Sequence, residues 1–118
     1  MGRLTCLFTV YLSCLISSQA QEAKIVGPGA ASCAQFNQEI ADMPSIDRDY
    51  LAWAQGFMSG ALMRAPPGVD EGIDLLPPTF RLQEQKEFLL QFCKNNADKD
   101  YVDGVRALYR HLRVLSKV

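Results

Sequence analysis

Few side chains in this sequence could do chemistry: its 118 residues contain one histidine and four cysteines. Any nucleophile–base pair would have to use the lone imidazole of His111, which lies between Arg110 and Leu112 near the end of the chain. Neither Cys33 nor Cys93 is predicted to be free to pair with it, and no G-x-S-x-G nucleophile elbow occurs. We therefore expect His111 to be a solvated surface residue and the protein to have no catalytic nucleophile.

Three carboxylates lie close together in the segment 64–78, at Asp70, Glu71 and Asp74. This segment contains four prolines and two glycines, which exclude a helix or a central strand. Acid–base catalysis needs side chains held to within about 0.5 Å, and such a loop offers no rigid support. The sequence DEGID also lacks the 12-residue spacing of a calcium loop. We expect no enzyme activity, no metal and no cofactor.

Residues 1–20 have the pattern of a cleaved secretory signal. Arg3 precedes the apolar run 4–16, and Ser18-Gln19-Ala20 places small residues before a cleavage position. The apolar run is about 13 residues long, shorter than the roughly 20 residues of a membrane-spanning helix. We expect the mature chain to begin at Gln21, to be exported to the periplasm and to have no membrane anchor.

Signal cleavage removes Cys6 and Cys14 and leaves Cys33 and Cys93. An even pair of cysteines in a small exported domain usually forms a disulfide. The alternative is a reactive thiol, but neither cysteine lies in a C-x-x-C pair or beside a candidate base. The sequence therefore predicts one structural disulfide, Cys33–Cys93.

The rest of the chain predicts an all-α fold, a small four-helix domain over 32–118 behind a flexible lead-in over 21–31. No segment alternates with the period of two that a strand needs, and four segments have helical spacing. Their apolar stripes are Cys33, Phe36 and Ile40; Tyr50, Trp53, Phe57 and Ala61; Leu82, Phe88, Leu89, Phe92 and Cys93; and Tyr101, Val105, Leu108, Leu112 and Leu115. The first helix is expected to begin at Ser32 and to end at Pro44, and the second to run from Ser45 or Asp47 to about Met63. The third is expected to begin at Thr79 or soon after and to end at Asn95-Asn96, and the fourth to begin at Asp98 or Asp100.

Two further patterns lie in and after the second predicted helix. Gly56 and Gly60 each cost up to about 1 kcal/mol in a helix, so they predict close backbone approach by a neighbouring helix or a partner chain. The alternative is that they are tolerated near the helix end.

The loop 64–78 is long for so small a domain, a property of mobile or functional loops. Its apolar residues, set among acids, are Val69, Ile73, Leu75 and Leu76.

Charge argues against one class of partner. The formal net charge is −1, with 48% hydrophobic and 21% charged residues. A protein that binds nucleic acid usually carries a clearly basic face that neutralises phosphates. We therefore expect a protein partner and no nucleic acid.

Three segments carry a family resemblance: CAQF at Cys33, WAQGFMSG at Trp53 and FCKNNADKDY at Phe92. Over 32–112 the chain resembles the HdeA/HdeB group of small periplasmic acid-stress chaperones. The resemblance implies a helical fold with one disulfide and a function in binding unfolded clients at low pH. It also implies that a dimer hides apolar surface near neutrality and that protonation of carboxylates in acid exposes this surface.

The residues that would act in this way fall into two sets. The candidate pH-switch acids are Asp47, Asp49, Asp70, Glu71 and Asp74, and the alternative is that they are merely solvated. The candidate partner-binding residues are Trp53, Phe57, Met58, Val69, Ile73, Leu75 and Leu76. For the aromatic stripe at Trp53 the alternative is a place in the core.

The WAQGFMSG helix and the helix after the proline turn are also similar to the Tai-type immunity proteins, exported inhibitors of peptidoglycan amidase effectors. This resemblance implies that the loop 64–78 plugs the groove of an enzyme at neutral pH. A third alternative is an exported helical protein with an unassigned role. The sequence leaves open which partner is bound and whether the protein forms a homodimer.

Overall fold

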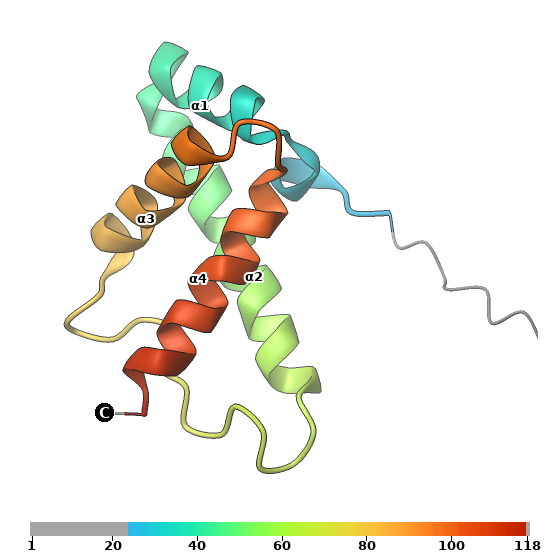
Figure 1. The fold of residues 1–118 in the computed structure, drawn as a ribbon, viewed down its shortest axis with the longest axis vertical. Coiled ribbons are helices and arrows are strands. Elements are labelled where there is room, and N and C mark those ends of the chain that lie inside the picture. The colour runs from blue at the N-terminus through green and yellow to red at the C-terminus, as the bar shows by residue number, and fades with distance from the viewer. Residues whose placement is uncertain (1–23, 118) are drawn as a thin grey trace, which may run out of the picture.

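Four α-helices account for most of residues 24–117, the part of the chain that this computed structural model describes (Figure 1). The elements are η1 (Gly27–Ala30), α1 (Cys33–Asp42), η2 (Pro44–Ile46), α2 (Asp47–Arg64), α3 (Leu82–Asn95) and α4 (Tyr101–Leu115). The all-α prediction is confirmed. The predicted signal segment 1–20 lies outside the described residues. Between residues 24 and 117, no helix has both the length and the apolar character needed to cross a membrane.

The helices begin and end for local reasons. The Ser32 hydroxyl accepts a hydrogen bond from the Gln35 N–H at 3.0 Å and caps α1, and Pro44 follows the end of this helix. Asp100 is the N-cap residue of α4, as predicted, and its N–H donates to Asp103 Oδ2 at 3.1 Å. Helix α3 begins at Leu82, soon after Thr79 as predicted, and before it the Phe80 N–H closes a turn onto the Pro77 carbonyl at 3.0 Å.

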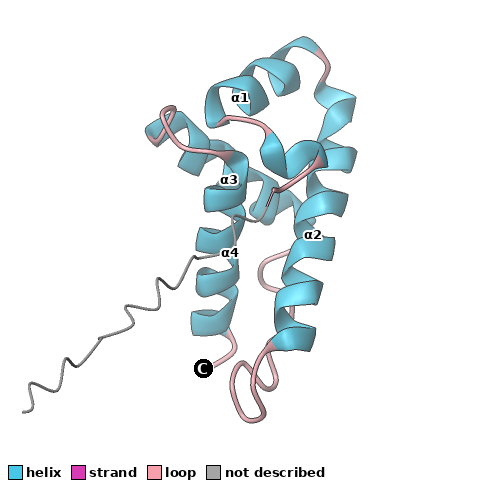
Figure 2. Ribbon diagram, turned by 90° about the vertical axis from the view of Figure 1, so that its right-hand side faces the viewer, coloured by secondary structure: helices cyan, strands magenta, loops and turns pink. Residues whose placement is uncertain are grey.

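The helices pack into a bundle with one helix lying across its end. Figures 1 and 2 both show α1 crossing the end of the bundle that is opposite to the long loop between α2 and α3. The C-terminus of α4 lies near this loop. Helix α4 packs against both α2 and α3, and its residues Tyr101, Val105, Leu108 and Leu112 are fully buried, as the predicted seam requires.

The predicted disulfide is confirmed. Cys33 at the start of α1 is bonded to Cys93 near the end of α3, with the two Cα atoms 4.7 Å apart and both residues fully buried. Beside it, the rings of Phe36, Tyr50 and Tyr101 pack with centroids 4.7 to 4.8 Å apart. The Tyr101 hydroxyl donates to the Tyr50 carbonyl at 2.8 Å. The disulfide and this aromatic cluster together fasten α1 across the bundle.

The prediction that the lead-in is flexible is wrong for residues 27–31. The Trp53 indole N–H donates to the Val26 carbonyl at 3.1 Å, and the Trp53 ring lies directly over buried Gly29. A Cβ atom at Gly29 would lie 2.0 Å from the Trp53 ring, so this position requires glycine. The Tyr101 N–H also donates to the Ala31 carbonyl at 2.9 Å, so this segment belongs to the domain.

The glycine at a close helix contact is Gly104, not Gly56 or Gly60. A Cβ atom at Gly104 would lie 3.0 Å from the Phe92 ring, where α4 packs against α3. Among residues 24–117, a Cβ atom at Gly56 or Gly60 would meet nothing within 4 Å. The predicted packing of a neighbouring helix of the same chain against these two glycines is therefore wrong, because they face outward. Contact with a partner chain stays a prediction.

Candidate functional site

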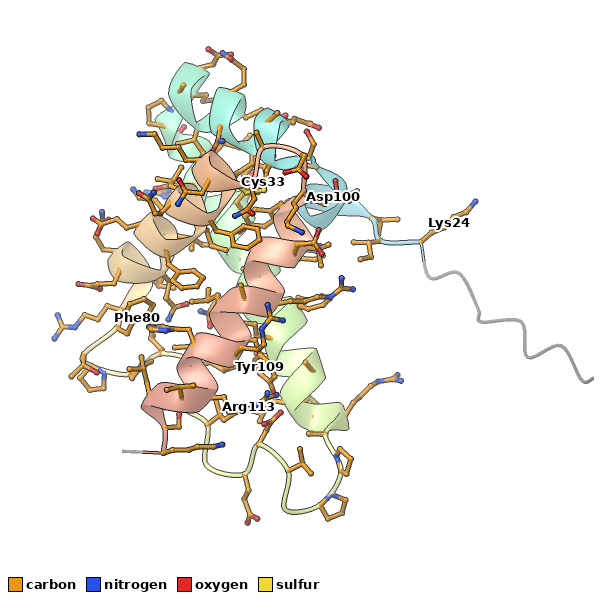
Figure 3. The ribbon with its side chains drawn as sticks, in the orientation of Figure 1. Lys24, Cys33, Phe80, Asp100, Tyr109 and Arg113 are labelled. Carbon is orange, nitrogen blue, oxygen red and sulfur yellow. A yellow bond between two sulfur atoms is a disulfide. The ribbon has the colours of Figure 1, made fainter. Side chains whose placement is uncertain are left out.

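The proline-rich loop, residues 65–81 between α2 and α3, is anchored to the helices at its centre by a carboxylate. Arg113 of α4 donates from Nε to Asp70 Oδ1 at 2.5 Å and from Nη2 to Asp70 Oδ2 at 2.9 Å. The Tyr109 hydroxyl donates to the same Oδ2 at 2.8 Å. Figure 3 shows Tyr109 and Arg113 on successive turns of α4, above the loop. The bidentate geometry fixes both the position and the orientation of the Asp70 carboxylate.

The environment of Asp70 favours its charged form. Its side chain is only 8% exposed. The hydrogen bonds from Arg113 are the main cause that lowers the pKa of Asp70, and Tyr109 adds to this effect. The same contact raises the pKa of Arg113. The expectation that the loop acids lack rigid support is therefore wrong for Asp70.

A second anchor holds the end of the loop that leads into α3. Gln85 is fully buried, and its amide donates to the Leu75 carbonyl at 2.9 Å and to the Phe80 carbonyl at 3.1 Å. Its own carbonyl accepts from Gln55 Nε2 of α2 at 2.6 Å. One buried amide thus joins the loop, α2 and α3. Among residues 24–117, no buried side-chain nitrogen or oxygen lacks a hydrogen-bond partner.

Gln85 is not among the predicted site residues, although its position in the sequence carries a signal. It lies four residues before Leu89 and eight before Cys93, so helical spacing places this polar residue on the buried face of α3. A polar side chain on a buried stripe requires hydrogen-bond partners, and the adjacent loop carbonyls supply them.

The other predicted switch acids do not gather around Asp70 in one cluster. Asp47 lies at the start of α2, where its Oδ2 accepts from Lys86 Nζ of α3 at 3.1 Å. Asp49, Glu71 and Asp74 are exposed, although Asp74 Oδ1 accepts from the Leu76 N–H at 2.8 Å and shapes the loop locally. Among the predicted acids, Asp47 therefore joins α2 to α3, and Asp70 joins the loop to α4.

Glu39, which was not predicted as a site residue, is a further acid that joins two elements. Glu39 of α1 accepts hydrogen bonds from the Tyr50 hydroxyl and from Gln35 Nε2, and the bond from Tyr50 is the main cause that lowers the pKa of Glu39. Burial raises the pKa of the Tyr50 hydroxyl, and its bond to Glu39 raises it further. Glu39 therefore joins α1 to α2 while its carboxylate is charged.

The predicted partner-binding residues divide by exposure. Met58 is fully buried, and Trp53 is stacked on Phe57 with ring centroids 5.2 Å apart. Ile73 and Leu75 are half-buried against the core, whereas Val69 and Leu76 are each 50% exposed. Of these seven predicted residues, Val69 and Leu76 are the exposed ones, Trp53, Phe57, Ile73 and Leu75 are partly buried, and Met58 is accessible only if the fold opens.

His111 is not the solvated residue that we expected. It is half-buried, its ring stacks on Phe88 with centroids 5.3 Å apart, and it packs against Phe80 at 4.8 Å. This contact fixes the last residues of the loop against α4. Among residues 24–117, no group of three or more histidine, cysteine, aspartate or glutamate side chains could hold a metal ion.

The chain matches no protein-family model, no curated protein and no solved structure.

Asp70 makes the stability of the domain depend on pH. A carboxyl group whose pKa is lower in the folded chain stabilises the fold above the unfolded pKa of about 3.9. This contribution is lost as the pH falls through the lower folded pKa. We expect Asp70 to titrate below the usual aspartate range when its carboxyl carbon is followed by NMR, with the amides of Val69 and Ile73 shifting in the same step. A titration of Asp70 at the ordinary aspartate pKa would contradict this prediction.

Proposed function

We propose that this is a non-catalytic, exported binding protein that releases its proline-rich loop in acid and then binds unfolded client proteins. The observation that supports this proposal is the Asp70 anchor, because a single carboxylate connects the centre of the loop to Arg113 and Tyr109. Protonation of Asp70 removes its charge and so weakens both contacts. The proposal agrees with the resemblance to the HdeA/HdeB acid-stress chaperones.

Release of the loop would uncover apolar surface. Ile73 and Leu75 pack against the core, so freeing them exposes their side chains and the core residues beneath them. Glu39 would also be protonated in acid, which weakens its bond with Tyr50 and loosens α1 from α2. The disulfide keeps Cys33 and Cys93 joined at any pH without reductant, so the chain would open without losing all of its structure.

The test compares apolar exposure and client protection across pH. We expect little binding of an apolar dye near neutral pH and strong binding at about pH 2.5, with helix content largely kept. Suppression of the aggregation of an acid-unfolded client should follow the same pH profile. Asp70→Asn imitates the protonated side chain, so it should shift the onset of dye binding to higher pH.

Asp98→Asn is the matched control. Asp98 is an exposed acid in the turn between α3 and α4, and its removal should leave the pH profile in place. Dye binding that is equal near neutrality and at about pH 2.5, or client aggregation that is unaffected in acid, would contradict the proposal.

A second function is favoured by the rigidity of the loop at neutral pH. The anchored loop presents Val69 and Glu71 outward, and a fixed loop loses little entropy when it enters a groove. This arrangement suits a Tai-type inhibitor of a peptidoglycan amidase. Inhibition of such an amidase near neutral pH, abolished by Val69→Asp, would support this function in place of the chaperone.

A further inference from the structure

Two surface hollows meet at Leu82, the first residue of α3. One, of about 440 Å³, lies between Leu76 of the proline-rich loop and the start of α3. The other, of about 340 Å³, lies between Leu51 on the first half of α2 and the same Leu82. Leu76 is 50% exposed and Leu82 40% exposed, so leucine side chains face solvent in the middle of this surface. We call the two hollows together the leucine groove.

The rim of the leucine groove is positively charged. Arg48 lines one hollow and Arg81 lines the other, and both are exposed. Among residues 24–117, neither guanidinium has a carboxylate within 4.0 Å. Asp47 also lines the groove, but its carboxylate is bound to Lys86 at 3.1 Å. The groove therefore offers two cationic groups beside apolar walls.

The groove is formed before any partner arrives. Gln55 lines the hollow on α2, and its amide donates to the Leu75 carbonyl at 3.3 Å and to Gln85 at 2.6 Å, which fixes the backbone next to Leu76. Arg81 Nε donates to the Pro78 carbonyl at 3.2 Å, which orients its guanidinium at the rim. Binding to a surface that is already ordered avoids much of the entropy cost of association.

We propose that the leucine groove binds a short segment of another protein that carries two apolar side chains and a carboxylate. The apolar side chains fill the two hollows on either side of Leu82, and the carboxylate pairs with Arg81 or Arg48. Exposed leucines beside arginine, with little competing negative charge, are typical of a protein-binding patch. This site acts on the folded domain near neutral pH and needs neither acid nor release of the loop.

The probe is a capped eight-residue peptide in which leucine and aspartate alternate, titrated into the full-length protein near neutral pH and followed by amide shifts in NMR spectra. We expect shifts at Leu51, Leu76 and Leu82, and a measurable Kd. Leu82→Gln and Arg81→Glu should each weaken binding by about tenfold or more, since an apolar anchor or a charge-assisted hydrogen bond is worth about 1.4 kcal/mol or more.

Met63→Gln and Arg110→Glu are the matched controls. Met63 is 86% exposed at the far end of α2, and Arg110 is an exposed arginine on α4, so neither change should alter the Kd. A peptide with lysine in place of aspartate should not bind. Circular dichroism checks that each variant folds, and Arg81→Glu, at an exposed position, still tests the proposal if Leu82→Gln does not fold.

Three results would overturn the proposal. The first is an unchanged Kd in both groove variants, and the second is equal binding of the lysine peptide. The third is that the groove variants instead abolish binding to anionic phosphatidylglycerol vesicles or a concentration-dependent dimer, which would assign the surface to lipid or to a second copy. Because this experiment is done near neutral pH, its failure is distinct from a failure of acid-induced dye binding.

Discussion

Cys33→Ser should lower the free energy of unfolding by about 4 kcal/mol, and Cys93→Ser should have the same effect. The two cysteines lie 60 residues apart in the chain, so the bond removes much of the conformational freedom of the unfolded state. Both sulfurs are fully buried where α1 crosses α3, so the lost bond also loosens the packing of α1. Urea unfolding of the oxidised protein measures the change.

The double variant is the control for this prediction. If each single change acts only by breaking the disulfide, the double variant should be about as unstable as either single variant. A double variant whose loss equals the sum of the two single losses would contradict this explanation. Reactive thiols at Cys33 and Cys93 in the wild-type protein, purified without reductant, would contradict the disulfide itself.

The helices and the disulfide could be predicted from the sequence because their signals are local or compositional. Helical spacing located all four helices, and the caps at Ser32 and Asp100 follow from side-chain types at the helix starts. If the predicted signal is cleaved, the two cysteines that remain allow only one intrachain pairing. These predictions required no knowledge of which loop lies against which helix.

The anchored loop could not be predicted, because its contacts join residues far apart in the chain. Asp70 lies 39 residues from Tyr109 and 43 residues from Arg113, and no local pattern pairs them. Its prolines and glycines predict a loop, and a loop of this composition is expected to lack rigid support. The fold instead brings the end of α4 to the loop, so the charged groups meet only in three dimensions.

The glycines also show that spacing in the sequence does not locate close packing. Gly56 and Gly60 have the four-residue spacing that suggests close helix packing, yet they face outward, whereas Gly29 and Gly104 lie against aromatic rings. The sequence shows that a side chain is missing at each of these positions. Only the packing of Trp53 and Phe92 shows where a side chain could not fit.

Gln85→Leu should lower the free energy of unfolding by about 2 to 3 kcal/mol, although leucine is similar in size and more apolar. The change removes one partner of a buried hydrogen-bond network and leaves the others in place. The Phe80 carbonyl loses its bond from Gln85, the Leu75 carbonyl keeps only the bond from Gln55, and Gln55 loses its acceptor on Gln85. A buried polar group left unpaired costs about 1 to 3 kcal/mol, which exceeds the gain from a more apolar side chain.

Chemical denaturation measures this loss, and Gln83→Leu is its matched control. Gln83 lies on the same helix but is exposed, and within residues 24–117 its side chain bonds only to Glu87 one turn away, so its replacement should change stability by less than about 0.5 kcal/mol. Hydrogen exchange separates the network from general packing. If Gln85 anchors the loop, the Ile73 and Leu76 amides should lose protection more than the α4 amides, which keep their helical hydrogen bonds. Equal loss of protection throughout the domain would show that Gln85 acts through the core and not through the loop.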